Sequence, residues 1–482
     1  MSAVEFHCDL SQHGSELLHS WEHCVGSCHA PLALRSDWQQ QLDRCRAELG
    51  FRFVRFHGLL SDDVGPIVKQ RHGQLVYSFF NTDRIIDFLL SIGMRPFIEL
   101  SFMPTVLASG SKTVFHYRGN VTPPRDHRQW ADLIRTLVTH WVDRYGIREV
   151  SKWFFEVWNE PNLKAFWAGS QQDYFKLYRV TAEAIKQVDR SLKVGGPATA
   201  RDAWIEEFLQ CCDARRVPVD FVTTHHYPTD ALGHEDDDTE TQLANSRRGL
   251  LREWTQDTRR RAGRRPLYYT EWNSSSNSRD PRHDEPYAAA FAAKTVLDAS
   301  DLTQGYSFWT FTDIFEENGL PSVPFHGGFG LVNLHGIAKP VYRAFELLHG
   351  LGREGLLVDG MHDTVNAWVT RATGVIKILL VNHALPRHPV RRVRARVHFD
   401  RCPKPRSAWV ERIDDTHANV KRRWQALGAP EYLDAKVVDQ LHQASRLKQQ
   451  PCRVTWRGRQ ARLEIELPPH AVAAVTVKLG PA

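Results

Sequence analysis

The sequence contains no long apolar run. No stretch approaches the ~18 consecutive apolar residues that a membrane-spanning helix needs, which argues against an integral membrane protein. The first residues, MSAVEFHCDLSQHG, have neither the basic segment nor the apolar segment of an export signal. We therefore expect a cytoplasmic protein with no membrane partner.

The eight cysteines do not form repeated CxxC pairs. We interpret them mainly as small buried hydrophobic residues in a reducing compartment. The one cluster that resembles a metal site is Cys24 and Cys28, flanked by His23 and His29. No second ligand pair follows at the spacing of a zinc finger, so we expect no metal and no other cofactor.

The chain has a modest excess of positive charge, +6, and its basic residues gather late, in RRVRAR at 391–396 and KRR at 421–423. Alternation with valine favours strands with one solvated face. Basic runs also supply phosphate contacts in nucleic-acid-binding proteins, but no recognised reader motif accompanies these runs. We therefore expect no nucleic-acid partner.

At 482 residues the chain is long enough for one barrel-sized domain and a smaller one. Up to about residue 350, apolar strands alternate with amphipathic helices. The eight strands of this pattern cover residues 21–26, 51–58, 95–102, 152–158, 193–198, 220–228, 266–273 and 305–315. Eight strands alternating with eight helices predict an α/β fold, a (β/α)8 TIM barrel over residues 14–350.

A different pattern begins near Leu356, where helical spacing gives way to short alternating strands. This pattern predicts an all-β domain, a sandwich, with one helical insertion near 433–447. The alternating VEFHCDL close to the N-terminus can pair with it, so the expected second domain comprises residues 1–13 plus 351–482. This domain could bind sugar, mediate assembly or only pack on the barrel, and the oligomeric state is not predicted.

The fourth strand, KWFFEVW, consists mainly of aromatic and other apolar residues and is followed directly by Asn159, Glu160 and Pro161. In a barrel, Glu160 would lie at the carboxyl end of a strand, where the chemistry of such folds is found. The alternative is a helix N-cap, because an acidic residue next to a proline is also how helices begin.

Other strands of the barrel also end in polar or aromatic residues, which should face one pocket. These residues are His57; Glu99 and Ser101; Asn159 and Glu160; His225, His226 and Tyr227; Glu271, Trp272 and Asn273; and Trp309, Asp313, Glu316 and Glu317. Two glutamates on strands four and seven lie roughly across the barrel mouth, as double displacement at a sugar anomeric carbon requires. One carboxyl must be protonated, and burial near Trp153 and Trp158 together with the charge of Glu271 could raise the pKa of Glu160.

Each of these residues also has a purely structural interpretation. His57 and His225 could be core histidines, Trp309 could be core packing, and Glu316 and Glu317 could be solvated loop carboxylates. Glu99 is expected to be structural, paired with Arg55 or Arg95. Two other classes of function stay open: a carbohydrate-binding barrel without catalysis, and a metal-dependent hydrolase that uses the histidines at 57, 225 and 226, although the first strand lacks the HxH pattern of barrel metallohydrolases.

The motifs WNEPN around Glu160, YYTEWNSS around Glu271, HHYP at 225–228 and FWTFTDIFEENG at 308–319 resemble glycoside hydrolase family 39, especially its β-xylosidases. CVGSCH and the RFHG at 55–58 fit as well, so the resemblance covers the barrel nearly end to end. NEP is common to the wider clan of retaining barrel glycosidases, whereas FTDIFEE is more specific.

The resemblance implies Glu160 as general acid/base, Glu271 as nucleophile and Asn159 as the partner of the substrate 2-hydroxyl. It implies a glycone pocket formed by His57, Phe115, His225, Tyr227, Trp309, Glu316 and Glu317. We therefore expect a retaining, exo-acting β-xylosidase that releases xylose from the non-reducing end of xylo-oligosaccharides, with a small oligosaccharide or glycoside as its partner. The alternatives are an α-L-arabinoside, a β-glucoside or an α-L-iduronide, the last of which needs a cation such as His226 or Arg279.

Overall fold

The structure is a computed structural model that describes residues 2–71, 74–230, 238–317 and 319–480. Eight parallel strands close into a barrel in the order β10-β11-β12-β13-β14-β3-β4-β7. They are β3 (Cys24–His29), β4 (Phe53–His57), β7 (Arg95–Glu99), β10 (Phe154–Glu156), β11 (Lys193–Ala200), β12 (Phe221–His225), β13 (Leu267–Trp272) and β14 (Gly305–Phe308). The predicted (β/α)8 barrel is confirmed.

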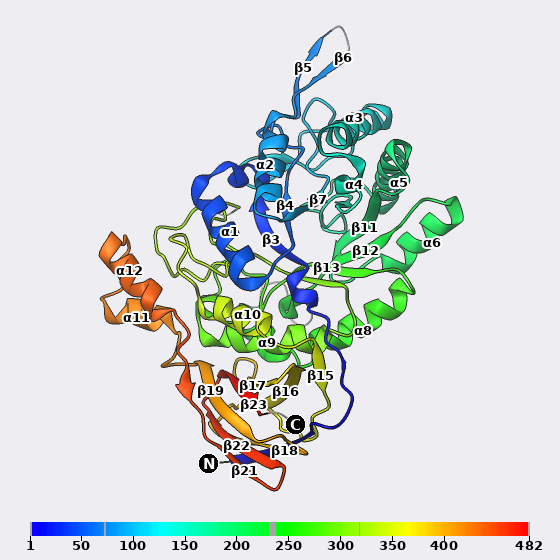
Figure 1. The fold of residues 1–482 in the computed structure, drawn as a ribbon. Helices are drawn as coiled ribbons and strands as arrows, with labels where there is room; N and C mark the ends of the chain where they lie inside the picture. The colour runs from blue at the N-terminus through cyan, green and yellow to red at the C-terminus, as the bar shows by residue number, and fades with distance from the viewer. Residues whose placement is uncertain (1, 72–73, 231–237, 318, 481–482) are drawn as a thin grey trace.

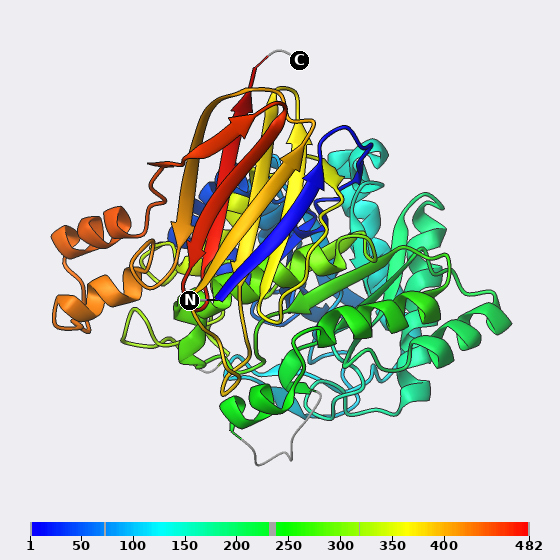
Figure 2. The ribbon, with the colours of Figure 1, turned by 90° about the horizontal axis from the view of Figure 1, so that it is seen from below.

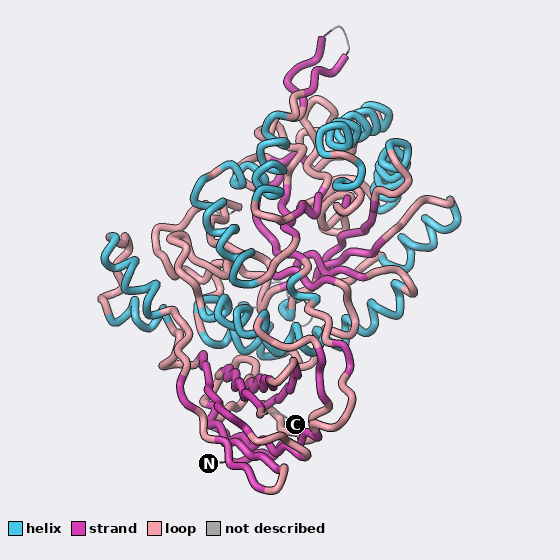
Figure 3. The backbone as a smooth tube through the Cα atoms, viewed as in Figure 1, coloured by secondary structure: helices cyan, strands magenta, loops and turns pink. Residues whose placement is uncertain are grey.

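Helices surround this barrel, as Figure 3 shows. Eight of them connect successive strands or follow the last one: α1 (Ser36–Leu49), α2 (Phe80–Ser91), α3 (His127–Tyr145), α5 (Gln171–Val188), α6 (Ile205–Arg215), α8 (Leu250–Ala262), α9 (Pro286–Ala299) and α10 (Pro340–His349). Two shorter helices, α4 (Ile147–Val150) and α7 (Thr239–Asn245), lie in the connections. Helix α1 buries Trp38, Leu42 and Leu49 on one face, and Gly50 ends it with a left-handed φ of 76°.

The interior of the barrel is apolar at one end and polar at the other. A layer of rings from the starts of the strands fills the amino-terminal end, with Phe53, Phe97, Phe154 and Tyr268 among its members. Because this layer closes the bottom of the barrel, the polar groups that follow along the same strands gather at the carboxyl-terminal end.

Two sheets of mainly antiparallel strands lie against the barrel and are seen in Figure 2 beside helices of the barrel wall. The first sheet has the order β1-β18-β22-β21 and the second the order β2-β15-β16-β17-β23-β19-β20. The strands are β1 (Ser2–Asp9), β2 (Ser15–Glu16), β15 (Glu354–Leu356), β16 (Val365–Ala372), β17 (Val375–Asn382), β18 (Val393–Asp400), β19 (Pro405–Ile413), β20 (Gln450–Pro451), β21 (Val454–Arg457), β22 (Gln460–Leu467) and β23 (Val472–Leu479). Their inner faces form a separate apolar core that includes Phe6, Ile378, Phe399 and Val475.

The chain therefore uses both of its ends in the same layers. Strand β1 pairs in parallel with β18, and β2 pairs antiparallel with β15. These pairings are what a discontinuous second domain requires, whereas the boundaries at 13/14 and 350/351 stay a prediction.

Some element limits differ from those expected. Residues 20–22 form a 3-10 helix closed by the contact of His19 with Glu22, so the first strand begins at Cys24 rather than at residue 21. The last strand of the barrel ends at Phe308, well before residue 315, because the chain then leaves the sheet and bonds to Val332 through Asp313.

Two further elements were not fully predicted. The helical insertion holds two helices, α11 (Val420–Ala426) and α12 (Ala435–Ala444), rather than one. A hairpin of β5 (Ile67–Arg71) and β6 (Gln74–Tyr77) extends from the barrel and stands at the top of Figure 1. Across the described ranges, no helix has the length and apolar character to cross a bilayer.

Candidate active site

Glu160 stands at a strained point of the backbone directly after β10. Trp158 and Glu160 adopt positive φ angles of 74° and 41°, which cost free energy in residues with a side chain and are concentrated at functional sites. The Glu160 amide donates to the carbonyl oxygen of Ala198, and no regular helix begins until α5. The helix-cap interpretation of Glu160 is therefore wrong.

The structure brings Glu160 and Glu271 together around His225. One carboxylate oxygen of each glutamate and a ring nitrogen of His225 all lie within 4.8 Å of one another. The His225 Nδ1 atom is 3.0 Å from Glu160 Oε1 and 3.6 Å from Glu271 Oε2. Carboxyl groups of retaining glycosidases are about 5 to 5.5 Å apart, whereas inverting enzymes leave room for a water molecule at about 6.5 to 9.5 Å. The short separation fits retention.

A hydrogen-bond chain behind His225 assigns the position of the proton on Glu160. The Thr270 hydroxyl donates to Glu156 Oε1 at 2.8 Å, so toward His225 Nε2, 3.0 Å away, it can only accept. His225 Nε2 is then the protonated nitrogen, and burial lowers the pKa of His225 to about 4, which leaves Nδ1 without a proton. The contact between Nδ1 and Glu160 therefore needs a proton on Glu160.

Burial is also the main cause that raises the pKa of Glu160, to about 7, against the opposing charges of His57 and Arg55. The expectation of a raised pKa is met, but its expected surroundings are partly wrong. Trp153 precedes β10 and bonds to Glu149 instead of approaching Glu160.

Arg55, on β4, connects the polar groups of the pocket. Its fully buried guanidinium donates to Glu156 at 2.5 Å, to Glu271 at 2.8 Å and to Asn159 Oδ1 at 2.9 Å, and it lies 2.8 Å from Glu99. The predicted pairing of Glu99 with Arg55 is confirmed. Because Asn159 accepts this bond through its oxygen, its amide NH2 group is left as a donor for a substrate hydroxyl.

Two further residues contact Glu271. The Tyr227 hydroxyl donates to Oε2 at 3.0 Å, and His57 Nε2 lies 3.7 Å from Oε1. Burial alone would lower the pKa of His57, but the carboxylate of Glu99, 2.6 Å from Nδ1, raises it to about 9. His57 is therefore a cation inside the pocket and not an inert core histidine.

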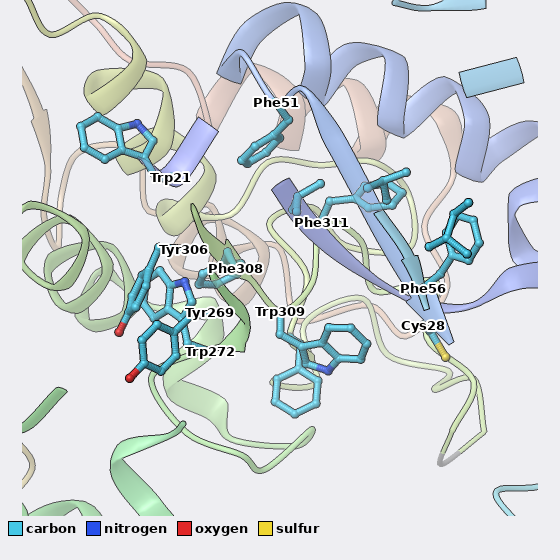
Figure 4. Close-up of a cluster of buried hydrophobic side chains, with 14 of the residues drawn as sticks. Trp21, Cys28, Phe51, Phe56, Tyr269, Trp272, Tyr306, Phe308, Trp309 and Phe311 are labelled. Atoms are coloured by element: carbon cyan, nitrogen blue, oxygen red, sulfur yellow. The ribbon is translucent and has the colours of Figure 1, made fainter. Parts of the chain in front are cut away.

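Aromatic rings lie beside these polar groups. The centroid of the Trp309 ring lies 4.8 Å from that of the His57 ring. The Phe115 ring lies 6.5 Å from the His57 ring and is nearly parallel to it. Trp309 packs so closely over β3 that a methyl group on Gly26 would lie 2.4 Å from the indole. Figure 4 shows Trp309 and Cys28 away from Trp21 and Phe51, which belong to the opposite part of the core.

Glu316 and Glu317 are neighbours in sequence with different partners. Glu317 Oε1 lies 3.7 Å from His57, and burial raises the pKa of Glu317 to about 8 while the charge of His57 opposes the shift. Glu316 Oε1 lies 2.9 Å from His29 Nδ1, and Asp63 lies 3.1 Å from the other nitrogen of that ring. The side chain of Glu316 is only 22% exposed and that of Glu317 only 13%, so the interpretation of these residues as solvated loop carboxylates is wrong.

His226 does not join this group. Its ring stacks on Tyr269 with centroids 4.0 Å apart, and its nitrogens contact Asp202 and the hydroxyl of Tyr306. The proposed metal set of His57, His225 and His226 is therefore not assembled. Within the part of the chain that the structure describes, the residues able to share a metal ion are Glu160, His225 and Glu271, which are the carboxylate pair itself and its bridging histidine.

The sequence did not predict the supporting roles of Thr270 and His29, and for Arg55 it predicted only the pairing with Glu99, not the bonds to Glu156, Glu271 and Asn159. A charged residue inside the dry strand FRFVRFH was the signal for Arg55. The sequence contained no signal for Thr270, because strict alternation along β13 would direct Thr270 and Glu271 to opposite faces of the strand. A register shift between Tyr269 and Trp272 disturbs this alternation, and both side chains reach the pocket.

Comparison with known proteins shows the family to which this chain belongs. The family model for glycosyl hydrolases family 39 matches residues 4–461. A β-xylosidase of Caldicellulosiruptor saccharolyticus is 50% identical over 467 residues, 95% of either chain, and one of Geobacillus stearothermophilus is 40% identical over 88% of this chain and 86% of its own. The crystal structure of a monomeric β-xylosidase from Caulobacter crescentus superposes with a TM-score of 0.87 at 31% identity, over 99% of this chain and 100% of the other. The chain belongs to glycosyl hydrolase family 39.

Proposed function

We propose that this glycoside hydrolase is a retaining, exo-acting β-xylosidase that removes xylose from the non-reducing end of xylo-oligosaccharides, as in xylan degradation. The observation that carries the proposal is the juxtaposition of Glu160, whose pKa burial raises to about 7, with Glu271 across His225. Two β-xylosidases that align over most of this chain support the choice of xylose.

The reaction proceeds in two displacements. Glu271 attacks the anomeric carbon while Glu160 gives its proton to the glycosidic oxygen, so the C–O bond breaks and a covalent glycosyl-enzyme forms. Glu160, now a carboxylate, takes a proton from water as the water oxygen attacks the same carbon and the bond from that carbon to Glu271 breaks. Xylose leaves with its original configuration, and both glutamates return to their starting states.

The remaining pocket residues receive the glycone. We assign Asn159 to the 2-hydroxyl and Tyr227 to the orientation of Glu271, while His57, His225, Glu316 and Glu317 offer charged and polar contacts. Phe115 and Trp309 provide apolar surface for the sugar ring. The ring of Tyr117 stacks on His29 with centroids 3.6 Å apart, and Phe115 lies 5.6 Å from Phe166, so loops after β7 and β10 meet over one side of the pocket. This closure supports exo action.

A neutral glycone suits the pocket better than an iduronide. A uronate needs a cation, but the cations nearest to the pair, Arg55 and His57, already contact glutamates. Glu316 and Glu317 add carboxyl groups where the glycone would lie. Arabinoside and glucoside substrates stay as alternatives within the same chemistry.

We further propose a cytoplasmic location and the division into a barrel, 14–350, and a sandwich, 1–13 plus 351–482. All eight cysteines are free, six of them buried, which supports a reducing compartment. We propose that nucleic acid is not a partner, because arginines of the basic run at 391–396 pair with Glu464 and Glu466.

A panel of chromogenic glycosides tests the proposed activity, with product stereochemistry followed by NMR. We expect xyloside to be hydrolysed fastest and the β-anomer of xylose to appear first. Glu271→Ala should lower kcat below about a hundredth of wild type, since it removes the nucleophile. Glu206→Ala, an exposed glutamate on α6, is the matched control and should not change kcat. A Glu271→Ala variant with more activity than that, or release of the α-anomer, would contradict the mechanism.

A further inference from the structure

His29 lies where segments from four strands of the barrel meet, beside the candidate active site. It is the last residue of β3, it pairs in register with His57 of β4, and its side chain is only 1% exposed. Asp63 comes from the connection after β4, Tyr117 from the connection after β7 and Glu316 from the segment after β14. All three contact the imidazole ring, which therefore joins segments that are distant in sequence.

The contacts of this imidazole determine its charge. Nδ1 lies 2.9 Å from Glu316 Oε1, and Nε2 lies 3.1 Å from Asp63 Oδ2. An ionised carboxylate can only accept hydrogen bonds, so each ring nitrogen needs a proton to face its partner. Burial alone would lower the pKa of His29, but the two carboxylates raise it above its ordinary value. Tyr117 covers one face of the ring with centroids 3.6 Å apart, and an aromatic face attracts a cation. His29 is therefore an imidazolium cation.

This cation distinguishes two neighbouring carboxyl groups of the pocket. Glu316 lies within hydrogen-bond distance of His29, whereas Glu317 Oε1 lies 3.7 Å from His57, beyond that distance. Burial raises the pKa of Glu317 to about 8, so Glu317 is mainly neutral near pH 7. The two side chains therefore offer a sugar different groups: Glu316 is a carboxylate that accepts, and Glu317 is a carboxyl that can also donate.

Glu316 keeps one oxygen for a ligand. Oε1 faces His29, while Oε2 lies 3.8 Å from Nε2 of the exposed His116, too far for a hydrogen bond. A hydroxyl that donates to a charged oxygen makes a bond roughly twice as strong as one between neutral groups. A carboxylate whose orientation is already fixed also loses less conformational entropy when a sugar binds. Both effects depend on the contact with His29.

We propose that His29 is a positioning residue for glycone recognition: held as a cation by Asp63, it fixes the orientation and the charge of Glu316, which accepts a hydrogen bond from a hydroxyl of the sugar ring. His29 acts through Glu316 and not by touching the substrate. The contact of Glu316 with the glycone rests on the proposed function, whereas the roles of His29 and Asp63 rest on their own geometry.

Deoxy substrates separate this role from a purely structural one. Aryl β-xylosides that lack the 2-, 3- or 4-hydroxyl are compared with the parent xyloside by kcat/KM. In wild type, loss of the hydroxyl that Glu316 binds should cost about tenfold or more, as for a hydrogen bond to a charged group. Glu316→Gln identifies this hydroxyl, because the penalty for its removal becomes small in that variant.

His29→Gln should reduce the same penalty to below about threefold, because a neutral glutamine no longer holds Glu316 as a fixed anion. The penalty for loss of the 2-hydroxyl, which is assigned to Asn159, should stay as in wild type. This difference between hydroxyls is the readout that a general disturbance of the fold would not produce.

Asp63→Asn tests the cation with little change of shape. The side chain of Asp63 is 40% exposed, so this variant should fold even if His29→Gln does not. It should lower the same penalty to a smaller extent, since the ring keeps Glu316 as its other partner. Asp43→Asn, at an exposed position of α1, is the matched control and should leave every penalty unchanged.

Wild-type penalties in both His29→Gln and Asp63→Asn would overturn the proposal. So would a loss of kcat/KM by one common factor for all the xylosides, because a residue that only supports the fold produces that result. If Glu316→Gln changes no penalty, Glu316 does not bind the glycone and the inference falls with that assignment. Preference for another sugar in the glycoside panel contradicts the proposed function alone, and the deoxy analogues of that sugar then give the same test.

Discussion

At the scale of single residues, the pocket gives two glutamates different surroundings. Glu160 contacts the unprotonated Nδ1 of a neutral histidine, which accepts a hydrogen bond, while Glu271 contacts the cation Arg55 and the hydroxyl of Tyr227. The same side chain can therefore act as an acid in one position and as a nucleophile in the other. The difference comes from partners on other strands and not from the residues next to each glutamate in sequence.

The raised pKa of Glu160 predicts how activity depends on pH. Only the protonated carboxyl can release a poor leaving group, so kcat/KM for xylobiose should fall about tenfold per pH unit above about 7, the pKa of Glu160. The pH profile of kcat/KM measures this alkaline limb. An activated aryl xyloside needs little protonation of its leaving group, so Glu160→Gln should still cleave it. In that variant the alkaline fall in kcat/KM should be weaker than in wild type, because the titrating carboxyl is gone.

Glu317 is the control for this assignment, because burial raises its pKa to about 8 and it could titrate in the same region. Glu317→Gln should retain the limb near pH 7 even if KM rises. A limb that disappears in Glu317→Gln would transfer the assignment from Glu160 to Glu317.

At the scale of elements, a glycine on the first strand of the barrel leaves space for an aromatic ring of the site. Gly26 on β3 has no side chain, and the indole of Trp309 from the end of β14 occupies that space. The indole in turn lies beside His57 from β4. Three neighbouring strands thus determine where the aromatic wall of the pocket stands.

Gly26→Ala should displace Trp309 without removing any polar group of the site. The new methyl group would lie 2.4 Å from the indole, far inside contact distance, so the ring must move. We expect a loss of about tenfold or more in kcat/KM, since small displacements of groups that position the substrate are costly, together with a change in tryptophan fluorescence. Gly249→Ala is the matched control, because its methyl group would meet its nearest neighbour at 3.6 Å. Wild-type kinetics in Gly26→Ala would show that Trp309 does not contact the glycone.

At the scale of the whole molecule, the two ends of the chain are held in one structure. Strand β1 places Phe6 in the core of the sandwich and Glu5 on its outer face, where Glu5 pairs with Arg396 and His398. The alternation along β1 therefore separates packing from surface charge at adjacent positions.

Phe6→Ala should destabilise the sandwich by about 3 to 5 kcal/mol, the usual cost of removing a buried phenylalanine. Thermal unfolding monitored by calorimetry should show an earlier transition, while kcat/KM at 25 °C stays near wild type. Glu5→Ala, the next residue on the opposite face, should change the transition little because exposed ion pairs contribute weakly. Equal transitions in the two variants would mean that β1 adds nothing to the stability of the molecule.

The sequence by itself determined the eight-stranded barrel, the β-sandwich beside it and the pairing of two carboxylates, because all three depend on local signals. Apolar periodicity marks strands and helices, and in a barrel the carboxyl ends of all strands face one pocket, so Glu160 and Glu271 could be paired from the order of strands alone. His57, Asn159, His225, Tyr227 and Trp309 could be found by the same rule.

Only the tertiary structure decided how these groups are supported. Arg55 contacts residues about 100 and 216 positions away, Thr270 reaches the pocket through a register shift, and Glu316 depends on His29 from the first strand. A cavity likewise lies between the start of α9, α11 and the turn after β22, which belong to distant parts of the chain. Contacts of this kind have no period and no fixed spacing, because they form where closing the barrel and packing the sandwich against it place distant residues together.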